Sequence, residues 1–159
     1  MNTIYTVPTD TSKEKRVKLL RKIFKRPKEG VECMFVQLTK TVGMKIYNNS
    51  RDAYKSRSKQ FSAWEIGIAP KVLSIVKKCD TSNLLKYDNQ GVLDNNDFVG
   101  YFYMTQVAKT PAGYCKVKET CRLYDKLESI GFSSDDTHSG NLGRIGKKLV
   151  MIDFGDMST

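Results

Sequence analysis

Three polar side chains near the end of the sequence have the types and the spacing that phosphate chemistry requires. Asn141 lies five positions after Asp136, and Asp153 lies twelve positions after Asn141. A hydroxyl that attacks a nucleotide phosphate needs a carboxylate beside the attacking oxygen and oxygen ligands that hold Mg²⁺ on the phosphates. A tight hairpin between Asn141 and Asp153 would return both side chains to one metal ion. The segment therefore predicts a loop, a hairpin and a second loop.

The same segment carries two motifs. Asp136-Thr137-His138-Ser139-Gly140-Asn141, followed by a hairpin and Asp153-Phe154-Gly155, resembles the catalytic loop and the metal-binding loop of the protein-kinase-like superfamily. The first motif looks like that of bacteriophage-encoded serine/threonine kinases and of aminoglycoside- or choline-type phosphotransferases. The resemblance implies that Asp136 is the catalytic base, that Asn141 and Asp153 are Mg²⁺ ligands, and that His138 braces the loop. The alternative is an acidic turn followed by an unrelated Asp-Phe-Gly.

The resemblance extends toward the N-terminus. The segment 42–46 looks like the third-strand lysine motif, which implies that Lys45 reaches the α- and β-phosphates of ATP. The segment 100–108 resembles the strand and hinge beside the adenine. It implies Met104 at the gatekeeper position and the backbone of Thr105 and Val107 at the adenine edge. The residues alone leave open a surface lysine and an aromatic strand that only packs in the core.

Two positions depart from the family pattern. A helical glutamate is expected to pair with Lys45 about ten residues before Pro70, and Gln60 stands there. A neutral amide can orient Lys45 by hydrogen bonding but cannot neutralise its charge. Glu65 is the alternative partner. The phosphate-covering loop is also poor in glycine, because Gly30 and Gly43 are the only glycines between 28 and 45.

The elements that must position these residues follow from hydrophobic periodicity and from turn residues. A capping box at 11–14 predicts a basic amphipathic helix that ends before Pro27, after a loosely ordered 1–10. The patterns then alternate between pairs of strands and single helices. We expect strands at 31–38, 41–47, 72–76, 98–107 and 149–152, helices at 51–66 and 114–130, and a loop at 79–97.

This order predicts an α+β protein with a minimal protein-kinase-like fold. The expected parts are a basic N-terminal helical extension (1–28), an upper lobe with a small antiparallel sheet and a hinge (29–110), and a truncated helical lower lobe with a β-hairpin (111–159). The truncation is expected because the sequence ends four residues after Gly155. A half-built lobe would expose apolar surface, so a homo-oligomer is one way to cover it.

The charge of the chain is concentrated at one end. The sequence has 27 Lys and Arg against 17 Asp and Glu, and residues 1–60 account for the whole net charge of +10. Binding of nucleic acid or of an acidic protein surface is therefore expected, if at all, through the basic stretch from Lys13 to Lys28. Four scattered cysteines and one histidine favour reduced thiols over a zinc site. No stretch is apolar enough to span a membrane, so a cytoplasmic protein is expected.

Two functions from different classes follow. The first is an ATP- and Mg²⁺-dependent phosphotransferase, which the resemblance narrows to a phage-type serine/threonine protein kinase that acts on host proteins in the bacterial cytoplasm. The second is a kinase-like binding protein that inhibits or modulates a host partner without phosphotransfer. Transfer of the nucleotide itself instead of the phosphoryl group is a variant of the first.

Overall fold

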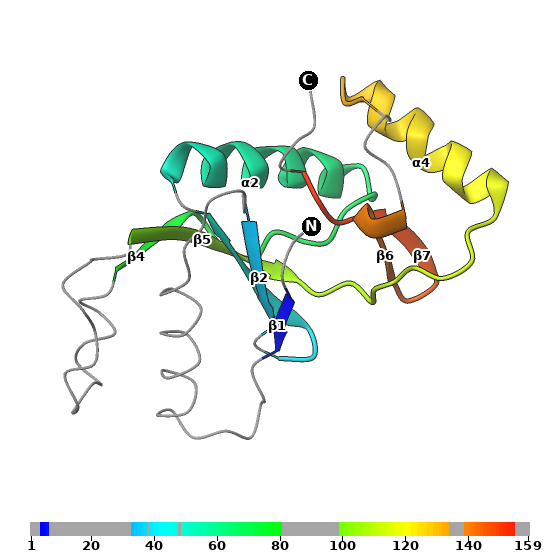
Figure 1. The fold of residues 1–159 in the computed structure, drawn as a ribbon. Coiled ribbons are helices and arrows are strands. Elements are labelled where there is room, and N and C mark those ends of the chain that lie inside the picture. Colours follow the sequence, from blue (N-terminus) through cyan, green and yellow to red (C-terminus); the bar gives the residue numbers. More distant parts are fainter. Residues whose placement is uncertain are drawn as a thin grey trace.

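A five-stranded sheet forms the larger part of the described structure (Figure 1). The computed structural model describes residues 4–6, 33–37, 39–47, 49–80, 99–133 and 139–154. The strand order is β1-β2-β3-β5-β4, and every neighbouring pair is antiparallel except β1 and β2, which are parallel. The strands are β1 (Ile4–Thr6), β2 (Cys33–Gln37), β3 (Val42–Tyr47), β4 (Lys77–Asp80) and β5 (Val99–Gln106).

The sequence predicted β2, β3 and β5 to within two residues at each end, and it predicted that β2 and β3 are antiparallel. β1 was not expected, since 1–10 was interpreted as loosely ordered. Its three residues pair with Phe35, Val36 and Gln37 at the edge of the sheet. The hydrogen bonds of a strand are made to another segment, and a strand of three residues is too short to leave a periodic signal in its own sequence.

Helix α2 (Ser50–Glu65) packs across one face of the sheet, as Figure 1 shows. The side chain of Asn49 caps it, because Asn49 Oδ1 accepts a hydrogen bond of 2.8 Å from the amide of Asp52. Four of its five buried residues follow one another at spacings of three and four positions, which places them on the face toward the sheet. They are Ala53, Ser56, Gln60 and Ala63.

The expected strand at 72–76 is replaced by one isolated bridge between Val72 and Thr105, and β4 begins at Lys77. Ser74 explains the break. Its hydroxyl accepts a hydrogen bond of 2.8 Å from the amide of Met104, and this side-chain contact replaces a backbone carbonyl in the ladder. The ladder resumes where Lys77 faces Phe102. Part of the expected loop at 79–97 is therefore strand, and the rest lies outside the described residues.

The second part of the fold is helix α4 (Val117–Ser129) with the hairpin of β6 (Leu142–Ile145) and β7 (Lys148–Met151). The hairpin and the helix agree with the sequence prediction, except that α4 begins three residues later than expected. The Glu119 carboxylate accepts a hydrogen bond of 2.9 Å from the amide of Lys116, and this contact sets the start of the helix.

One hydrophobic cluster joins α2, which lies in the expected upper lobe, to α4 and the hairpin, which lie in the expected lower lobe. Its central residues are Ala63, Leu127, Met151 and Phe154, all fully buried. A second cluster fills the space between the sheet and α2 and includes Tyr47, Ala53 and Tyr103. The fold is thus mixed α/β with a small, mainly antiparallel sheet. The described part contains no helix long and apolar enough to cross a membrane.

The expected basic helix at 11–26 lies outside the described residues, so the stretch from Lys13 to Lys28 stays a prediction. Of the cysteines whose side chains the structure describes, Cys115 and Cys121 are free.

Candidate active site

Lys45 lies on β3 and points toward α2, where it is buried with 7% of its surface exposed. Its Nζ donates a hydrogen bond of 3.0 Å to Gln60 Oε1 and another of 2.5 Å to the backbone oxygen of Ile152. The same Nζ lies 5.5 Å from the ring centre of Phe154 and 6.0 Å from that of Tyr103. Lys45 is therefore held in one direction by partners from α2, from β5 and from the chain that follows the hairpin.

Gln60 is the α2 residue that contacts Lys45, as the sequence predicted for this position. Its Oε1 accepts from Lys45 and, at 2.8 Å, from the Tyr103 hydroxyl. Its Nε2 donates to the Pro70 backbone oxygen at 3.0 Å and to Thr105 Oγ1 at 2.7 Å. A lysine only donates and a carbonyl only accepts, so these neighbours fix which way the amide points.

Glu65, the alternative partner, is the last residue of α2 and is exposed. The structure therefore gives Lys45 an uncharged helical partner.

A second layer of polar contacts holds Gln60 in place. The hydroxyls of Tyr47 and Ser56 lie 2.5 Å apart, and Ser56 Oγ lies 3.2 Å from the Tyr103 hydroxyl. The rings of Tyr47 and Tyr103 are stacked with 6.2 Å between their centres. Because all of these groups are buried, each one lost would leave a polar neighbour without its partner.

The hairpin brings Asn141 and Asp153 together, as their spacing predicted. Leu142 pairs with Met151, and the amide of Ile152 donates a hydrogen bond of 2.8 Å to the Asn141 backbone oxygen. Asp153 is the next residue after Ile152. Ile152, whose carbonyl binds Lys45, therefore contacts Asn141 across the hairpin and precedes Asp153 in the sequence. Both side chains are half-buried, and both make further interactions.

The donor set fits a magnesium ion. An amide oxygen from Asn141 and a carboxylate from Asp153 are the hard oxygen ligands that Mg²⁺ takes, and Mg²⁺ completes its coordination with waters and substrate phosphates. Among the described residues there is no group of three or more His, Cys, Asp or Glu side chains that could hold a metal by themselves. A site of one Asp and one Asn therefore depends on the substrate for the remaining ligands.

Asp136, the expected catalytic base, and His138, the expected brace, lie outside the described residues. The description stops after residue 133, which follows α4, and resumes at a short 3₁₀ helix (Ser139–Asn141) that leads into the hairpin. The role of Asp136 stays a prediction.

The three residues expected at the adenine lie on β5 and just after it. Met104 pairs with Met44, on the sheet face opposite Lys45, and its carbonyl accepts a hydrogen bond of 2.8 Å from Leu73. Thr105 pairs with Gly43 and therefore shares the face of Lys45, where its hydroxyl contacts Gln60. Of the two, Thr105 is thus the residue whose side chain lies beside Lys45.

Val107 is expected to offer its backbone to an adenine edge. In this structure its amide donates a hydrogen bond of 2.9 Å to the backbone oxygen of Thr41. A ligand would have to displace Thr41 before it could use this amide.

Phe35 covers Gly43 on the Lys45 face of the sheet. Phe35 pairs with Lys45 across β2 and β3, and a Cβ placed on Gly43 would lie 2.3 Å from the Phe35 ring. Only a glycine leaves room for the ring in this position. An aromatic ring therefore lies beside Lys45 in the part of the chain where the sequence predicted a glycine-poor phosphate-covering loop.

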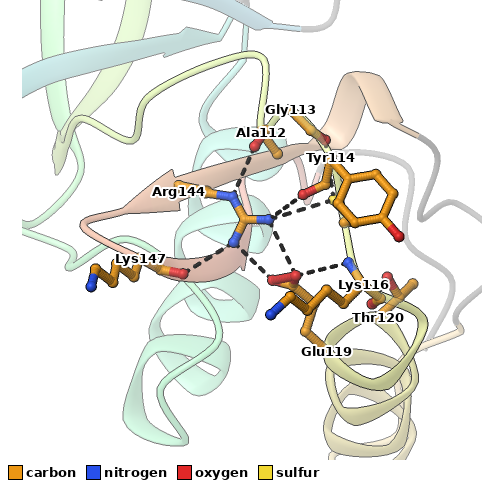
Figure 2. Close-up of polar contacts among 9 residues, drawn as sticks. Ala112, Gly113, Tyr114, Lys116, Glu119, Thr120, Arg144 and Lys147 are labelled. Carbon is orange, nitrogen blue, oxygen red and sulfur yellow. Dashed lines mark hydrogen bonds and ion pairs between the residues drawn. The ribbon is translucent and has the colours of Figure 1, made fainter.

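Arg144 on β6 is an organising residue that the sequence analysis missed (Figure 2). Its Nε donates to the Ala112 oxygen at 2.8 Å, and its Nη1 donates to Glu119 Oε1 at 2.8 Å and to the Lys147 oxygen at 3.0 Å. Its Nη2 donates to the Tyr114 oxygen at 2.7 Å and to Glu119 Oε2 at 3.3 Å. All five N–H groups have partners, so one side chain ties the hairpin to the segment leading into α4.

The charge pair within this group shifts two pKa values. The hydrogen bond from Arg144 and a second one from the Lys116 amide hold the pKa of Glu119 below its ordinary value, and the Glu119 carboxylate raises the pKa of Arg144. No local motif marks a single arginine before a Gly-Lys-Lys turn as important. Two of its partners are the backbone carbonyls of Ala112 and Tyr114, about thirty residues earlier in the sequence. Only the tertiary structure identifies it.

No protein-family model, curated protein or solved structure matches this chain.

Proposed function

We propose that this protein is an ATP- and Mg²⁺-dependent phosphotransferase, and specifically a protein kinase that phosphorylates serine or threonine in proteins of its host. One observation carries the proposal. Lys45 donates a hydrogen bond to the carbonyl of Ile152, which lies more than a hundred residues later in the sequence. The amide of Ile152 binds the backbone of Asn141, and Asp153 is the next residue. The basic group suited to phosphates thus contacts the backbone of the segment that carries two oxygen donors suited to Mg²⁺, and this contact supports the proposal.

In this proposal each residue has a separate task. Lys45 would bind phosphate oxygens of ATP, and Asn141 and Asp153 would hold Mg²⁺, which when bound would neutralise charge on the phosphates. Asp136 accepts the proton of the substrate hydroxyl as that oxygen attacks the γ-phosphorus. The bond between the γ-phosphorus and the bridging oxygen breaks, and ADP leaves with the electron pair of that bond.

The surroundings of Lys45 support binding of an anion. α2 contributes the neutral amide of Gln60, and Phe154 and Tyr103 contribute ring faces. These partners orient the ammonium group without adding a negative charge from the helix. A phosphate oxygen that approaches Lys45 would therefore not compete with a helical carboxylate.

The direct test is transfer of label from γ-labelled ATP to a bulk protein such as casein, to the protein itself and to proteins of a host lysate. We expect transfer by the wild type and loss of at least about a hundredfold in Asp136→Ala and Asp153→Ala, as for groups that act on the reacting atoms. Asp125→Ala is the matched control, because Asp125 is an exposed aspartate on α4. Transfer that survives both active-site changes would refute the proposal.

Label on the α-phosphate distinguishes nucleotide transfer from phosphoryl transfer. If α-label and not γ-label reaches the acceptor, the protein is a nucleotidyl transferase that uses the same site.

A second function is favoured by Gln60. A lysine without a charged helical partner suits a kinase-like protein that binds a host partner and transfers no phosphate. Thermal unfolding with and without Mg-ATP separates the two functions when it is combined with the label assay. A ligand at 100 times its dissociation constant stabilises the folded state by about 2.7 kcal/mol. Stabilisation without any label transfer would support the binding protein.

A further inference from the structure

Exposed apolar side chains lie on α2 and on the segment that follows this helix. Figure 1 shows this segment running from the end of α2 back toward β4. Six large hydrophobic side chains are exposed in the described part of the chain, and four of them are here: Tyr54, Phe61, Leu73 and Ile75. Tyr54 and Ile75 have 60% and 68% of their surface exposed. Contiguous apolar surface on a folded protein commonly marks a binding site.

Arg57 connects the helix with the segment that follows it. Its Nε donates a hydrogen bond of 2.7 Å to the Ser74 backbone oxygen, between Leu73 and Ile75. Its guanidinium lies 5.8 Å from the ring centre of Phe61, one helical turn further along α2. Trp64 continues the surface, because its ring meets Phe61 edge to face at 5.5 Å. We call Tyr54, Arg57, Phe61, Trp64, Leu73 and Ile75 the α2 patch.

Basic residues surround the α2 patch. Between 49 and 78 the sequence has seven Lys and Arg against two Asp and Glu. One of these acids, Asp52, accepts a hydrogen bond of 2.8 Å from the Asn49 side chain at the helix cap. Exposed basic side chains near the patch are Arg51 and Lys55 on α2, Lys71 beside Trp64, and Lys78, which pairs with Tyr101 and so lies on the α2 face of the sheet. An apolar centre inside a positive rim is complementary to a ligand with apolar anchors and negative charge.

The contacts of the rings favour a polypeptide over a nucleic acid. Bases bind exposed aromatic side chains by stacking on a free ring face. One face of Phe61 carries Arg57, and Lys71 lies 5.6 Å from the ring centre of Trp64. The most exposed member of the patch, Ile75, has no ring at all. Aliphatic and partly covered aromatic side chains suit apolar anchors of a protein better than stacked bases.

A second copy of this chain is a poor occupant. A symmetric dimer would place two positive rims against each other, and each chain has a net charge of +10.

We propose that the α2 patch is a docking surface for an acidic polypeptide segment of another protein, with aliphatic or aromatic side chains that seat on Tyr54, Phe61 and Ile75 and carboxylates that meet the basic rim. This docking is independent of phosphotransfer, since none of the patch residues belongs to the candidate active site.

Trp64 allows a direct test, because it is the only tryptophan of the chain and lies in the patch. The probe is a synthetic peptide of glutamates with leucine at every third or fourth position and no tryptophan. We expect a saturable change in Trp64 fluorescence that weakens with added salt. Ile75→Asp and Tyr54→Asp should each lower the affinity at least about tenfold, since each removes an anchor and adds a repelling charge.

Val117→Asp is the matched control, since Val117 is an exposed aliphatic residue on α4 outside the patch, and it should leave binding unchanged. The same peptide with lysine in place of glutamate, or with serine in place of leucine, should not bind. Equal binding of the lysine peptide, or binding unaffected by both patch variants, would overturn the proposal. So would tighter binding of oligothymidine or of phosphatidylserine vesicles at the patch, or a dimer that Ile75→Asp dissociates.

Discussion

At the residue scale, the amide of Gln60 matches its surroundings in a way that a carboxylate cannot. Its oxygen accepts two hydrogen bonds and its nitrogen donates two, so the whole hydrogen-bonding capacity of the side chain is used. A glutamate would place an oxygen against the Pro70 carbonyl, and neither atom could donate. The surroundings of this position therefore fit a glutamine and not a glutamate.

Replacement of Gln60 by leucine tests this account. The change removes one of the buried hydrogen bonds of the Lys45 ammonium and of the Tyr103 hydroxyl, and it removes the donor that binds the Pro70 carbonyl. We expect the free energy of unfolding to fall by about 3 kcal/mol or more, measured by urea denaturation. Gln37→Leu is the control, since the hydrogen bond that the Gln37 side chain donates to the Thr39 carbonyl is exposed. A similar small loss in both variants would contradict the role of the network.

The Phe35 ring packs against Gly43, and this contact is possible because glycine has no Cβ atom. Gly43→Ala should lower the free energy of unfolding by about 1–3 kcal/mol, because the new methyl group would collide with the Phe35 ring. In a Phe35→Ala background the same change should cost clearly less. The difference between the two costs is measured by a double-mutant cycle. Equal costs in both backgrounds would mean that the ring does not limit this position.

At the element scale, the hairpin is held by Arg144 as well as by its own ladder. The arginine links β6 to three backbone carbonyls and to the first turn of α4 (Figure 2). Since Asn141 precedes β6 and Asp153 follows β7, the position of this hairpin decides where both oxygen donors lie. The orientation of the predicted metal site thus depends on a residue that binds no ligand itself.

The ion pair of Arg144 and Glu119 gives the protein a defined pH dependence. The pKa of Glu119 is lowered in the folded state from an ordinary value of 4.5, so its contribution to stability is fully present above about pH 4.5. The contribution is lost as the pH falls through the lower folded value. The gap in melting temperature between wild type and Glu119→Gln should therefore be constant at neutral pH and shrink below pH 4.5.

Glu65→Gln is the control for this series, because Glu65 is exposed at the end of α2 and should change the melting temperature little at any pH. A gap for Glu119→Gln that widens on acidification would reverse the expected sign and refute the assignment.

At the scale of the whole molecule, Phe154 connects the parts. It is fully buried in the cluster formed by α2, α4 and the hairpin, and its ring also lies beneath the Lys45 ammonium. The core and the candidate active site therefore share one side chain, and loss of packing in one disturbs the other.

Phe154→Ala should lower the free energy of unfolding by about 3–5 kcal/mol, as for other large side chains removed from a core. Thermal or urea unfolding measures the loss. Tyr114→Ala is the control, since the Tyr114 side chain is exposed and only its backbone oxygen binds Arg144. A loss no larger than that of the control would show that Phe154 does not connect the core.

Local patterns in the sequence determined much of this protein. Alternation and helical periodicity predicted β2, β3, β5 and α2, because these elements bury one face and their apolar spacing records it. The spacing of Asn141 and Asp153 predicted the hairpin. The contact of Lys45 with Gln60 was also predicted, because the resemblance placed Gln60 at the helical position that faces the lysine. The chemistry at Lys45, Asn141 and Asp153 stays a prediction.

Only the tertiary structure decided the remainder. β1 exists because a neighbouring strand offers an edge, and Ser74 interrupts the expected strand by binding Met104 across the sheet. The face on which Met104 and Thr105 lie follows from strand register, and the role of Arg144 follows from carbonyls about thirty residues away. These contacts join segments far apart in sequence, where no local pattern records the partner. The physical reason is that a hydrogen bond depends on geometry in space and not on neighbours along the chain.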